Sequence, residues 1–401
     1  MTVALAFITY MDRVCISVTA PAILRDLRLT TIQMGFVFSA FTAAYALFEI
    51  PTGWWADRIG SRRVLTRIVV WWSVFTGLTG VAWNFPSLLA LRALFGVGEA
   101  GAWPTVARAL SRWFPEQERG TAQGIFFMGA HLGGGVTPIL VAAVAQRLGW
   151  RSTFPLLSVF GFIWAASWFR WFRDEPRDQP TVTAEELAWI EGGRRPVPEQ
   201  GNILRAAVKT PGIWFLCLMY FTQTYGFNLY VTWMPTYLQH EKQLHGVVLG
   251  ILAGLPLLLS VPADLLGGIL TDRLSLRYGL RPGRCLVGFG SLAAAGIFLF
   301  SGALARGVLA AVLIALAAAS ASFLLGATWS ACTDIAGNQA ATVSAAMNTS
   351  GQIGGVLSPI AFAVLTRSSA SWAAPLFVTA ALYLLGAGCW YFVHPERPLG
   401  A

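Results

Sequence analysis

Charged side chains are scarce in this sequence. Asp, Glu, Lys and Arg make up 12% of its 401 residues, hydrophobic residues make up 56%, and the mean hydropathy is +0.60. A water-soluble protein needs more polar surface than this composition provides. The chain is therefore expected to reside in a lipid bilayer.

Paired cysteines and clustered histidines are also lacking. The five cysteines fall singly in apolar segments or at their ends, and the four histidines are scattered. Free cysteines of this kind are typical of small buried hydrophobic residues, not of disulfides or metal ligands. No Ser/His/Asp arrangement is evident either, so we expect no enzyme activity, no metal and no cofactor.

Long apolar runs are abundant. About 20 residues cross the roughly 30 Å of hydrocarbon in a bilayer, and twelve runs reach that length: about 2–24, 31–55, 64–84, 86–110, 120–145, 152–172, 210–238, 246–270, 284–304, 307–333, 340–366 and 370–393. Twelve spans put both termini on one side. The first run contains Asp12 and Arg13 and is too long for the core of a signal peptide, so we predict that it is a span.

Basic residues are distributed unevenly between the two sides of the predicted membrane. The net charge is +9, and most bases fall in the loops after even-numbered spans or in the C-terminal tail. By the positive-inside rule both termini are cytoplasmic, and in the absence of an organelle signal we expect a bacterial inner membrane. This bias explains the charge without a nucleic-acid partner. The opposite side holds only Arg25, Arg28, Arg147, Arg151, Lys242, Arg306 and Arg367.

A polar stretch rich in proline divides the chain. It predicts an N-terminal six-helix bundle over 1–173, a cytoplasmic linker over 174–209 and a C-terminal six-helix bundle over 210–401. Within the linker, Thr183 and Glu186 match a capping box, which predicts a short amphipathic helix.

One motif occurs in both halves. Glycine lets helices approach closely, aspartate can cap the next helix or pair with arginine across the bundle, and arginines anchor the cytoplasmic edge. Its occurrence at the end of a span in each half predicts a duplicated transporter with a cytoplasmic gate, although a simple topology anchor is the alternative. The gate residues are Gly53, Asp57, Arg58, Gly60, Arg62 and Arg63 in the first half, and Asp272 and Arg273 in the second.

Seven ionisable residues lie within the predicted spans, where each costs about 2.5–3.5 kcal/mol at a helix centre. All but one belong to the first half, so we expect charge chemistry there and neutral ligand contacts from the second half. They are Asp12 and Arg13 in span one, Glu49 in span two, Arg92 and Glu99 in span four, His131 in span five and Asp264 in span eight.

Two interpretations of these residues are open. Arg92 and Glu99 share a helix face about two turns apart, so Asp12 with Arg92 and Arg13 with Glu99 could be structural ion pairs. Buried pairs stabilise poorly compared with apolar packing, however, and are usually retained for another role. Burial favours the protonated form of a carboxylate, and arginine binds anions by paired hydrogen bonds. We therefore favour one pocket that takes both a proton and an organic anion.

The first-half copy of the gate motif, from Gly53 to Arg63, resembles the signature loop of the major facilitator superfamily. Further motifs in spans one, three, four and seven are similar to those of the anion:cation symporter family within it. They are Tyr10 to Ser17, Trp72 to Thr76, Arg92 to Ala100 with Pro104, Trp113 to Glu116 with Arg119 and Gly120, and Trp233 to Tyr237.

The resemblance implies an all-α membrane protein with twelve transmembrane helices in two pseudo-symmetric six-helix bundles. It implies symport of a sugar acid, such as an aldonate, uronate or aldarate, with a proton by alternating access, in a monomer. Asp12 and Glu99 would be the proton-coupling carboxylates. The substrate contacts would be Arg13, Arg92, Tyr10, Tyr45, Gln223 and Asn348.

Three residues depart from the family pattern or add to it. Glu49 stands where relatives more often have glutamine, Asp264 adds an acid, and His131 lies where an amide could contact substrate. We expect a packed, hydrogen-bonded histidine, but these residues leave the carried anion open. The alternatives are a sodium-coupled or exchange transporter of another carboxylate and, further away, a membrane enzyme or a sensor that does not transport.

Overall fold

The computed structural model describes the whole chain except residues 193–208, 241–245, 370–372 and 400–401. Every regular element in the described part is helical. The predicted linker lies partly outside this part, in its residues 193–208, as does the predicted loop base Lys242.

The first half contains six main helical segments and a short connection. The helices are α1 (Thr2–Asp26), α2 (Thr31–Ile59), α3 (Ser61–Thr79), α4 (Phe85–Glu99), α5 (Ala102–Trp113) and α6 (Arg119–Trp171), with the short turns η1 (Glu116–Glu118) and η2 (Pro176–Asp178) and the linker helix α7 (Ala184–Gly192).

The second half follows the same plan. Its helices are α9 (Pro211–Thr232), α10 (Met234–His240), α11 (Gly246–Tyr278), α12 (Leu280–Leu304), α13 (Gly307–Phe323), α14 (Leu325–Ala336), α15 (Ala340–Ser369) and α16 (Ala374–Cys389), with the turns η3 (Gly337–Gln339) and η4 (Trp390–Phe392).

The helices reproduce the twelve predicted spans, with breaks and one fusion. The fifth and sixth spans form the single helix α6, interrupted where Gly149 adopts a left-handed φ of 78°. The fourth span breaks into α4 and α5 at Ala100 and Gly101, and the tenth breaks into α13 and α14 at Leu324. Among the described residues, seven helical stretches are long and apolar enough to cross a membrane.

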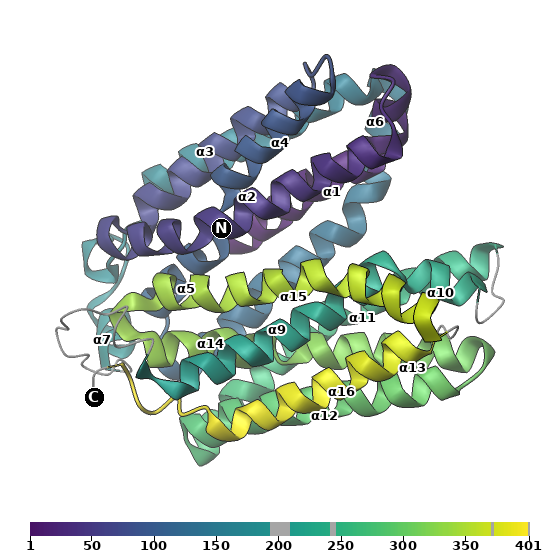
Figure 1. Cartoon of the computed structure of the whole chain (residues 1–401). Coiled ribbons are helices and arrows are strands. Elements are labelled where there is room, and N and C mark those ends of the chain that lie inside the picture. The colour runs from purple at the N-terminus through teal and green to yellow at the C-terminus, as the bar shows by residue number, and fades with distance from the viewer. Residues whose placement is uncertain (193–208, 241–245, 370–372, 400–401) are drawn as a thin grey trace.

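The helices form two groups (Figure 1). Helices of the first half, purple to blue, lie together, as do those of the second half, teal to yellow. The two groups meet at the end of the molecule that carries α5 and α7 and diverge toward the opposite end. We call the former the α7 end. Large apolar side chains such as Ile32, Leu47 and Ile139 remain exposed, as expected for a surface that contacts lipid.

The short linker helix begins as predicted. The Thr183 hydroxyl accepts a hydrogen bond of 3.2 Å from the Glu186 amide, which caps the first turn of α7. Ile190 is buried, whereas Trp189 is exposed on one side and donates its indole N–H to Glu118. The helix therefore lies against the first half with one apolar side chain inward.

Candidate functional site

A cavity of about 180 Å³ lies between the two halves. Its wall is made by α1, α5 and α6 from the first half and by α9, α14 and α15 from the second. The lining residues are Tyr10, Arg13, Trp103, Phe127, His131, Tyr220, Gln223, Thr224, Phe227, Asn228, Leu325, Trp329, Asn348 and Gln352. Four of the six predicted substrate contacts are among them: Tyr10, Arg13, Gln223 and Asn348.

Arg13 is the guanidinium on this wall, and it is held by a buried acid. Its Nε donates to Glu99 at 2.5 Å, and the Glu99 side chain is fully buried. Its guanidinium also lies 4.9 Å from the centre of the Tyr45 ring and 5.9 Å from that of Trp103. In the described part of the chain, Arg13 Nη2 and the second Glu99 oxygen lack hydrogen-bond partners, so both retain capacity for another ligand.

Asp12 and Arg92 lie behind this pair and away from the cavity wall. Asp12 is 1% exposed, interacts electrostatically with Arg92 and Glu99, and has the Trp72 indole as its hydrogen-bonding neighbour. Arg92 is equally buried, with its guanidinium 4.2 Å from the centre of the Phe95 ring. The expected direct pairing of Asp12 with Arg92 is therefore absent, whereas that of Arg13 with Glu99 is present. The substrate contact predicted for Arg92 stays a prediction.

Asn348 connects the cavity wall to the first half of the chain. Its side-chain amide donates to Glu49 at 2.5 Å and to the Tyr45 hydroxyl at 3.3 Å, and Thr349 donates to the second oxygen of Glu49. Tyr45 and Glu49 are buried and do not line the cavity. The structure thus gives Tyr45 and Glu49 a contact across the interface of the two halves.

Gln223 lines the cavity from α9 and is fixed by its neighbours. Its amide donates to the Ala321 carbonyl at 3.3 Å, and its carbonyl accepts from the Thr224 hydroxyl at 3.2 Å. The second-half contributions to the wall named above are uncharged, as predicted. They suit hydrogen bonds to hydroxyl and carboxylate oxygens.

His131 and Asp264 form a second ionisable pair at the cavity. The His131 Nδ1 lies 2.5 Å from one oxygen of Asp264, and both side chains are buried. His131 also lines the cavity near the Tyr10 ring. The prediction of a packed, hydrogen-bonded histidine is confirmed in its geometry.

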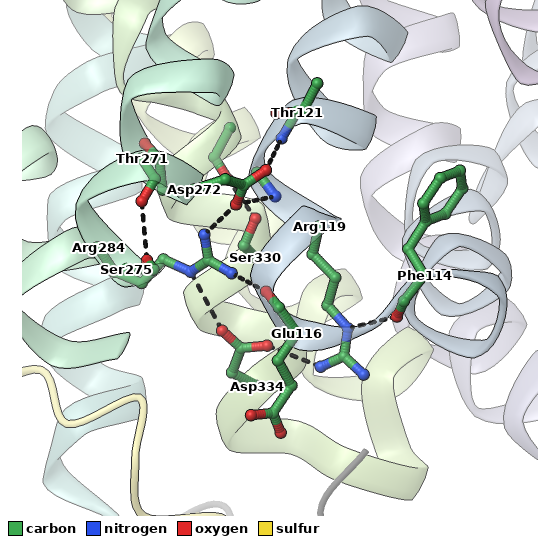
Figure 2. Close-up of polar contacts among 12 residues, drawn as sticks. Phe114, Glu116, Arg119, Thr121, Thr271, Asp272, Ser275, Arg284, Ser330 and Asp334 are labelled. Atoms are coloured by element: carbon green, nitrogen blue, oxygen red, sulfur yellow. Dashed lines mark hydrogen bonds and ion pairs between the residues drawn. The ribbon is translucent and has the colours of Figure 1, made fainter. Parts of the chain in front are cut away.

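Asp272 caps a helix of the opposite half (Figure 2). Its carboxylate accepts from the amides of Gly120 and Thr121, the second and third residues of α6, at 2.9 and 2.5 Å. A carboxylate is favourable there because the first amides of a helix lack partners and the helix dipole is positive at this end.

Arg284 joins this cap to a second acid. Its guanidinium is fully buried and donates to Asp272 at 2.7 Å and to Asp334 at 3.2 Å, while Arg119 donates to the other oxygen of Asp334 at 2.7 Å. Figure 2 shows the Arg284 guanidinium between the two carboxylates, with a further bond to the Glu116 carbonyl. The two halves are thus joined by a continuous charged network.

Asp57 makes the corresponding contact from the first half. It accepts from the amides of Ala341 and Thr342 at the start of α15, at 3.1 and 2.7 Å, and Arg108 lies 3.4 Å away. Of the two roles expected for the aspartate, a cap on the next helix is not formed, whereas each aspartate does pair with an arginine, Asp57 with Arg108 and Asp272 with Arg284. Both aspartates cap a helix of the opposite half, and we call these the capping contacts.

The remaining motif residues surround the capping contacts. Gly60 ends α2 with a φ of 101°, which favours glycine. Arg62 donates to the Phe169 carbonyl, and Arg58 stacks on the Trp54 ring 3.9 Å away. Gly53 faces α15 so closely that a Cβ atom there would lie 2.7 Å from the Ala341 carbonyl oxygen. Arg63 and Arg273 are exposed.

Several site residues were not predicted. Thr224 and Asn228 stand one turn apart on α9, and Gln352 stands one turn after the predicted Asn348 on α15. A search for polar residues at helical spacing in apolar runs would have found Thr224, Asn228 and Gln352. In the charged network, neither Arg284 nor Asp334 belongs to a motif that occurs in both halves, so no sequence pattern pointed to them.

The described residues contain no cluster of three His, Cys, Asp or Glu side chains that could hold a metal ion. The five cysteines are all free thiols in the structure.

Comparison with known proteins gives consistent relatives. A probable sulfoacetate transporter of Cupriavidus necator is 36% identical over 97% of this chain and 91% of its own length. The hexuronate transporter of Bacillus subtilis is 31% identical over 66% of this chain and 61% of its own, and a probable galactarate/D-glucarate transporter of Escherichia coli is 32% identical over 67% and 65%.

These relatives are of the anion:cation symporter type, which confirms the predicted resemblance. The helical fold and the seven apolar stretches agree with a multi-pass membrane protein. The family model described as Major Facilitator Superfamily matches residues 2–359. The chain is an integral membrane protein and belongs to the Major Facilitator Superfamily.

Proposed function

We propose that this protein is a secondary active transporter that moves a small organic anion together with a proton by alternating access. One observation carries the proposal: Arg13 lies on the cavity wall, and its charge is held by the buried Glu99. A substrate carboxylate and Glu99 compete for the same guanidinium.

Proton binding decides this competition. While Glu99 is ionised it neutralises Arg13, and when it is protonated the guanidinium becomes free to bind an anion. Asp12 lies beside the pair at 1% exposure, next to the Glu99 carboxylate, an environment that favours a neutral carboxylic acid. The anion and the proton together add little net charge to the membrane interior.

The substrate class follows from the wall. Arg13 provides one cationic group, and the amides of Gln223, Asn228 and Gln352 offer hydrogen bonds to hydroxyl groups. A cavity of about 180 Å³ suits a molecule of a few carbon atoms. The named substrates of the relatives, sulfoacetate, hexuronate and galactarate or glucarate, are small anions of this kind. We propose a sugar acid or a similar short carboxylate.

The α7 end faces the cytoplasm of a bacterial inner membrane in this proposal, because most of the loop bases gather on that side. The capping contacts then close the cytoplasmic side of the cavity, and their separation opens it. A single chain supplies both halves of the cavity, so one copy suffices for transport.

The test uses purified protein in proteoliposomes. Anions that raise its thermal stability are selected from aldonates, uronates, aldarates and sulfonated acids, and their uptake is driven by a pH gradient. We expect Asp12→Asn and Glu99→Gln to abolish uphill accumulation while leaving exchange of internal for external anion. The control is Asp26→Asn, an acid on the same helix that lies about half exposed beside Arg151 and should leave coupling unchanged.

Two results would contradict the proposal. Unchanged uphill uptake in both carboxylate variants would refute the coupling roles of Asp12 and Glu99. Accumulation driven by a sodium gradient and indifferent to pH would replace the proton with sodium.

A further inference from the structure

Two acids occupy equivalent positions in the two halves of the fold. Glu49 lies about two turns before Asp57 in α2, and Asp264 lies about two turns before Asp272 in α11, so the sequence offset that relates the capping aspartates also relates these acids. Both acids are fully buried. They lie further from the α7 end than the capping contacts do, toward the cavity.

Each of these acids also reaches a helix of the opposite half. Glu49 binds Asn348 of α15, and Asp264 binds His131 of α6, each at 2.5 Å. We call these the inner contacts. Between the inner and capping contacts Gly53 lets the two helices approach closely, since a Cβ there would lie 2.7 Å from the Ala341 carbonyl oxygen and 2.8 Å from the Ala345 Cβ.

The second interface is packed in the same way. A Cβ on Gly268 of α11 would approach the Gly120 carbonyl oxygen of α6 more closely than real Cβ contacts allow. A Cβ on Gly124 would lie 3.2 Å from the Gly268 Cα. The α2–α15 and α6–α11 interfaces therefore share one plan: a capping aspartate, a glycine contact and an inner acid.

The two inner contacts differ in their chemistry. The donors to Glu49 are an amide and a hydroxyl, which keep their hydrogens at any physiological pH. The donor to Asp264 is an imidazole, a side chain that can bind and release a proton at a ring nitrogen. The contact of 2.5 Å between Nδ1 and the carboxylate oxygen requires a hydrogen between them. With the imidazolium form the pair is neutral, and without that proton it leaves a buried negative charge.

We propose that His131 and Asp264 form a proton-binding site, separate from Asp12 and Glu99, that holds its proton while the α7 end is closed and releases it when α6 and α11 separate. His131 lines the cavity, which gives the proton a path from the side opposite the α7 end. The direction of proton movement in the cell rests on the proposed function, whereas the coupling of proton binding to closure does not.

The side chains around His131 and Asp264 leave the charge of this pair to be balanced within the pair itself. From α1, Tyr10 faces the His131 ring with centroids 6.4 Å apart, and Arg13 lies on the same cavity wall with its charge held by Glu99. Tyr220 is the titratable group that α9 adds to the wall, while α5 and α14 face it with Trp103 and Trp329. The other oxygen of Asp264 lacks a donor among the described residues.

The sign of the pH effect follows from linkage. The closed state binds the imidazolium proton more tightly, because only there does it neutralise a buried carboxylate. Lowering the pH therefore favours closure at the α7 end, and raising the pH favours opening. One linked proton changes the ratio of closed to open molecules by up to about tenfold per pH unit.

The experiment measures closure without any substrate. Spin labels at Ile59→Cys and Leu276→Cys, one exposed position on each half near the α7 end, are introduced after alanine replaces the five native cysteines. Double electron–electron resonance then gives the distance distribution between them in lipid nanodiscs as a function of pH. The measurements use an Asp12→Asn, Glu99→Gln background, so that these two carboxylates cannot supply the response.

In this background we expect the longer distances to gain population as the pH rises, and His131→Gln to remove that response. Asp264→Asn should remove it too and serves if the histidine variant folds poorly. Glu49→Gln is the matched control: it removes the acid of the other inner contact, so the pH response should persist in this variant.

Two outcomes overturn the proposal. One is a background that shows no pH response; the other is a response that persists in both His131→Gln and Asp264→Asn. Because the labels report closure without substrate, failure to transport organic anions would sink the proposed function alone.

Discussion

At the residue scale, Arg13 combines two kinds of partner that a lysine could not satisfy together. Its planar guanidinium lies among the rings of Tyr10, Tyr45 and Trp103 and binds Glu99 through one nitrogen. Arginine is suited to this site because it stacks on aromatic faces, stays charged and presents several donors in a fixed geometry.

We expect Arg13→Lys to lower the affinity for the transported anion by about tenfold or more, equivalent to about 1.4 kcal/mol. Lysine keeps the charge but loses the stacking and the paired hydrogen bonds. Calorimetric titration with the best anion from the stability screen measures the effect. The control is Arg25→Lys, an exposed arginine at the end of the same helix. Wild-type affinity in Arg13→Lys would show that Arg13 does not bind the anion.

Asp12 illustrates a cost that the fold accepts. A carboxylate that is 1% exposed in an apolar span destabilises the folded protein unless it is protonated or its charge is balanced. An asparagine or leucine would pack there more favourably. Its presence at that place is the reason to assign it a role in proton transfer, and the sequence already suggested this by placing an acid in the middle of an apolar span.

At the element scale, the capping contacts use helix ends as binding partners. Asp57 and Asp272 each accept from two backbone amides at the start of a helix in the other half. The arginine partners of the two aspartates differ. Asp272 also binds the fully buried Arg284, whereas Arg108 lies 3.4 Å from Asp57.

We expect Asp57→Ala to shift the closed state toward the open one by about 0.5–2 kcal/mol, the usual worth of a helix cap. Asp272→Ala should shift it further, by up to about 3–5 kcal/mol, since it leaves a buried arginine short of one partner. The Ile59 and Leu276 spin labels measure the shift. The matched control Asp57→Asn keeps an oxygen that can cap a helix, so it should shift the distribution less than Asp57→Ala. Distance distributions in all three variants that match the distribution of the unsubstituted protein would mean that the caps do not hold the closed state.

Much of the element level could be predicted from the sequence. Apolar run length located the spans, and Thr183 with Glu186 located the start of α7, because both signals are local. The partner of Asp57 could not be predicted in this way. It is the backbone of α15, far along the chain, and a backbone amide leaves no trace in a residue pattern.

Part of the candidate site could also be predicted from the sequence. Arg13 with Glu99 was anticipated from the cost of charge in a membrane, since each had to find a partner. The direction in which Arg92 points was not, because helical spacing fixes which residues share a face but not which face meets the other half. The structure turns Arg92 onto Phe95 and leaves Arg13 on the wall.

At the scale of the whole molecule, the two halves meet through few helices. The pairs α2 with α15 and α6 with α11 carry the capping and inner contacts, and neither pair involves the linker residues. The predicted boundaries at 173 and 210 would place the linker between two six-helix units, and the larger cluster of buried hydrophobic residues extends through both.

We expect the halves to assemble as separate chains. Co-expression of fragments 1–192 and 209–401, which omits residues 193–208, should give a complex that purifies in nearly equal amounts through a tag on either fragment. A matched break at Arg306, inside the second half between α12 and α13, should lower the recovery because it divides a packed unit. Recovery of the tagged fragment alone would show that the linker is needed for assembly and would contradict the proposed domain boundaries.

The use of backbone amides in the capping contacts has a consequence for how this protein can change over generations. Every amino acid except proline brings the same N–H, so position 121 can change without releasing the closure, whereas a Cβ at Gly120 would lie 2.5 Å from an Asp272 oxygen and Thr342 also donates its hydroxyl to Asp57. The two aspartates have no such latitude. A survey of natural variants would therefore show the two aspartates more clearly than the backbone amides that they cap.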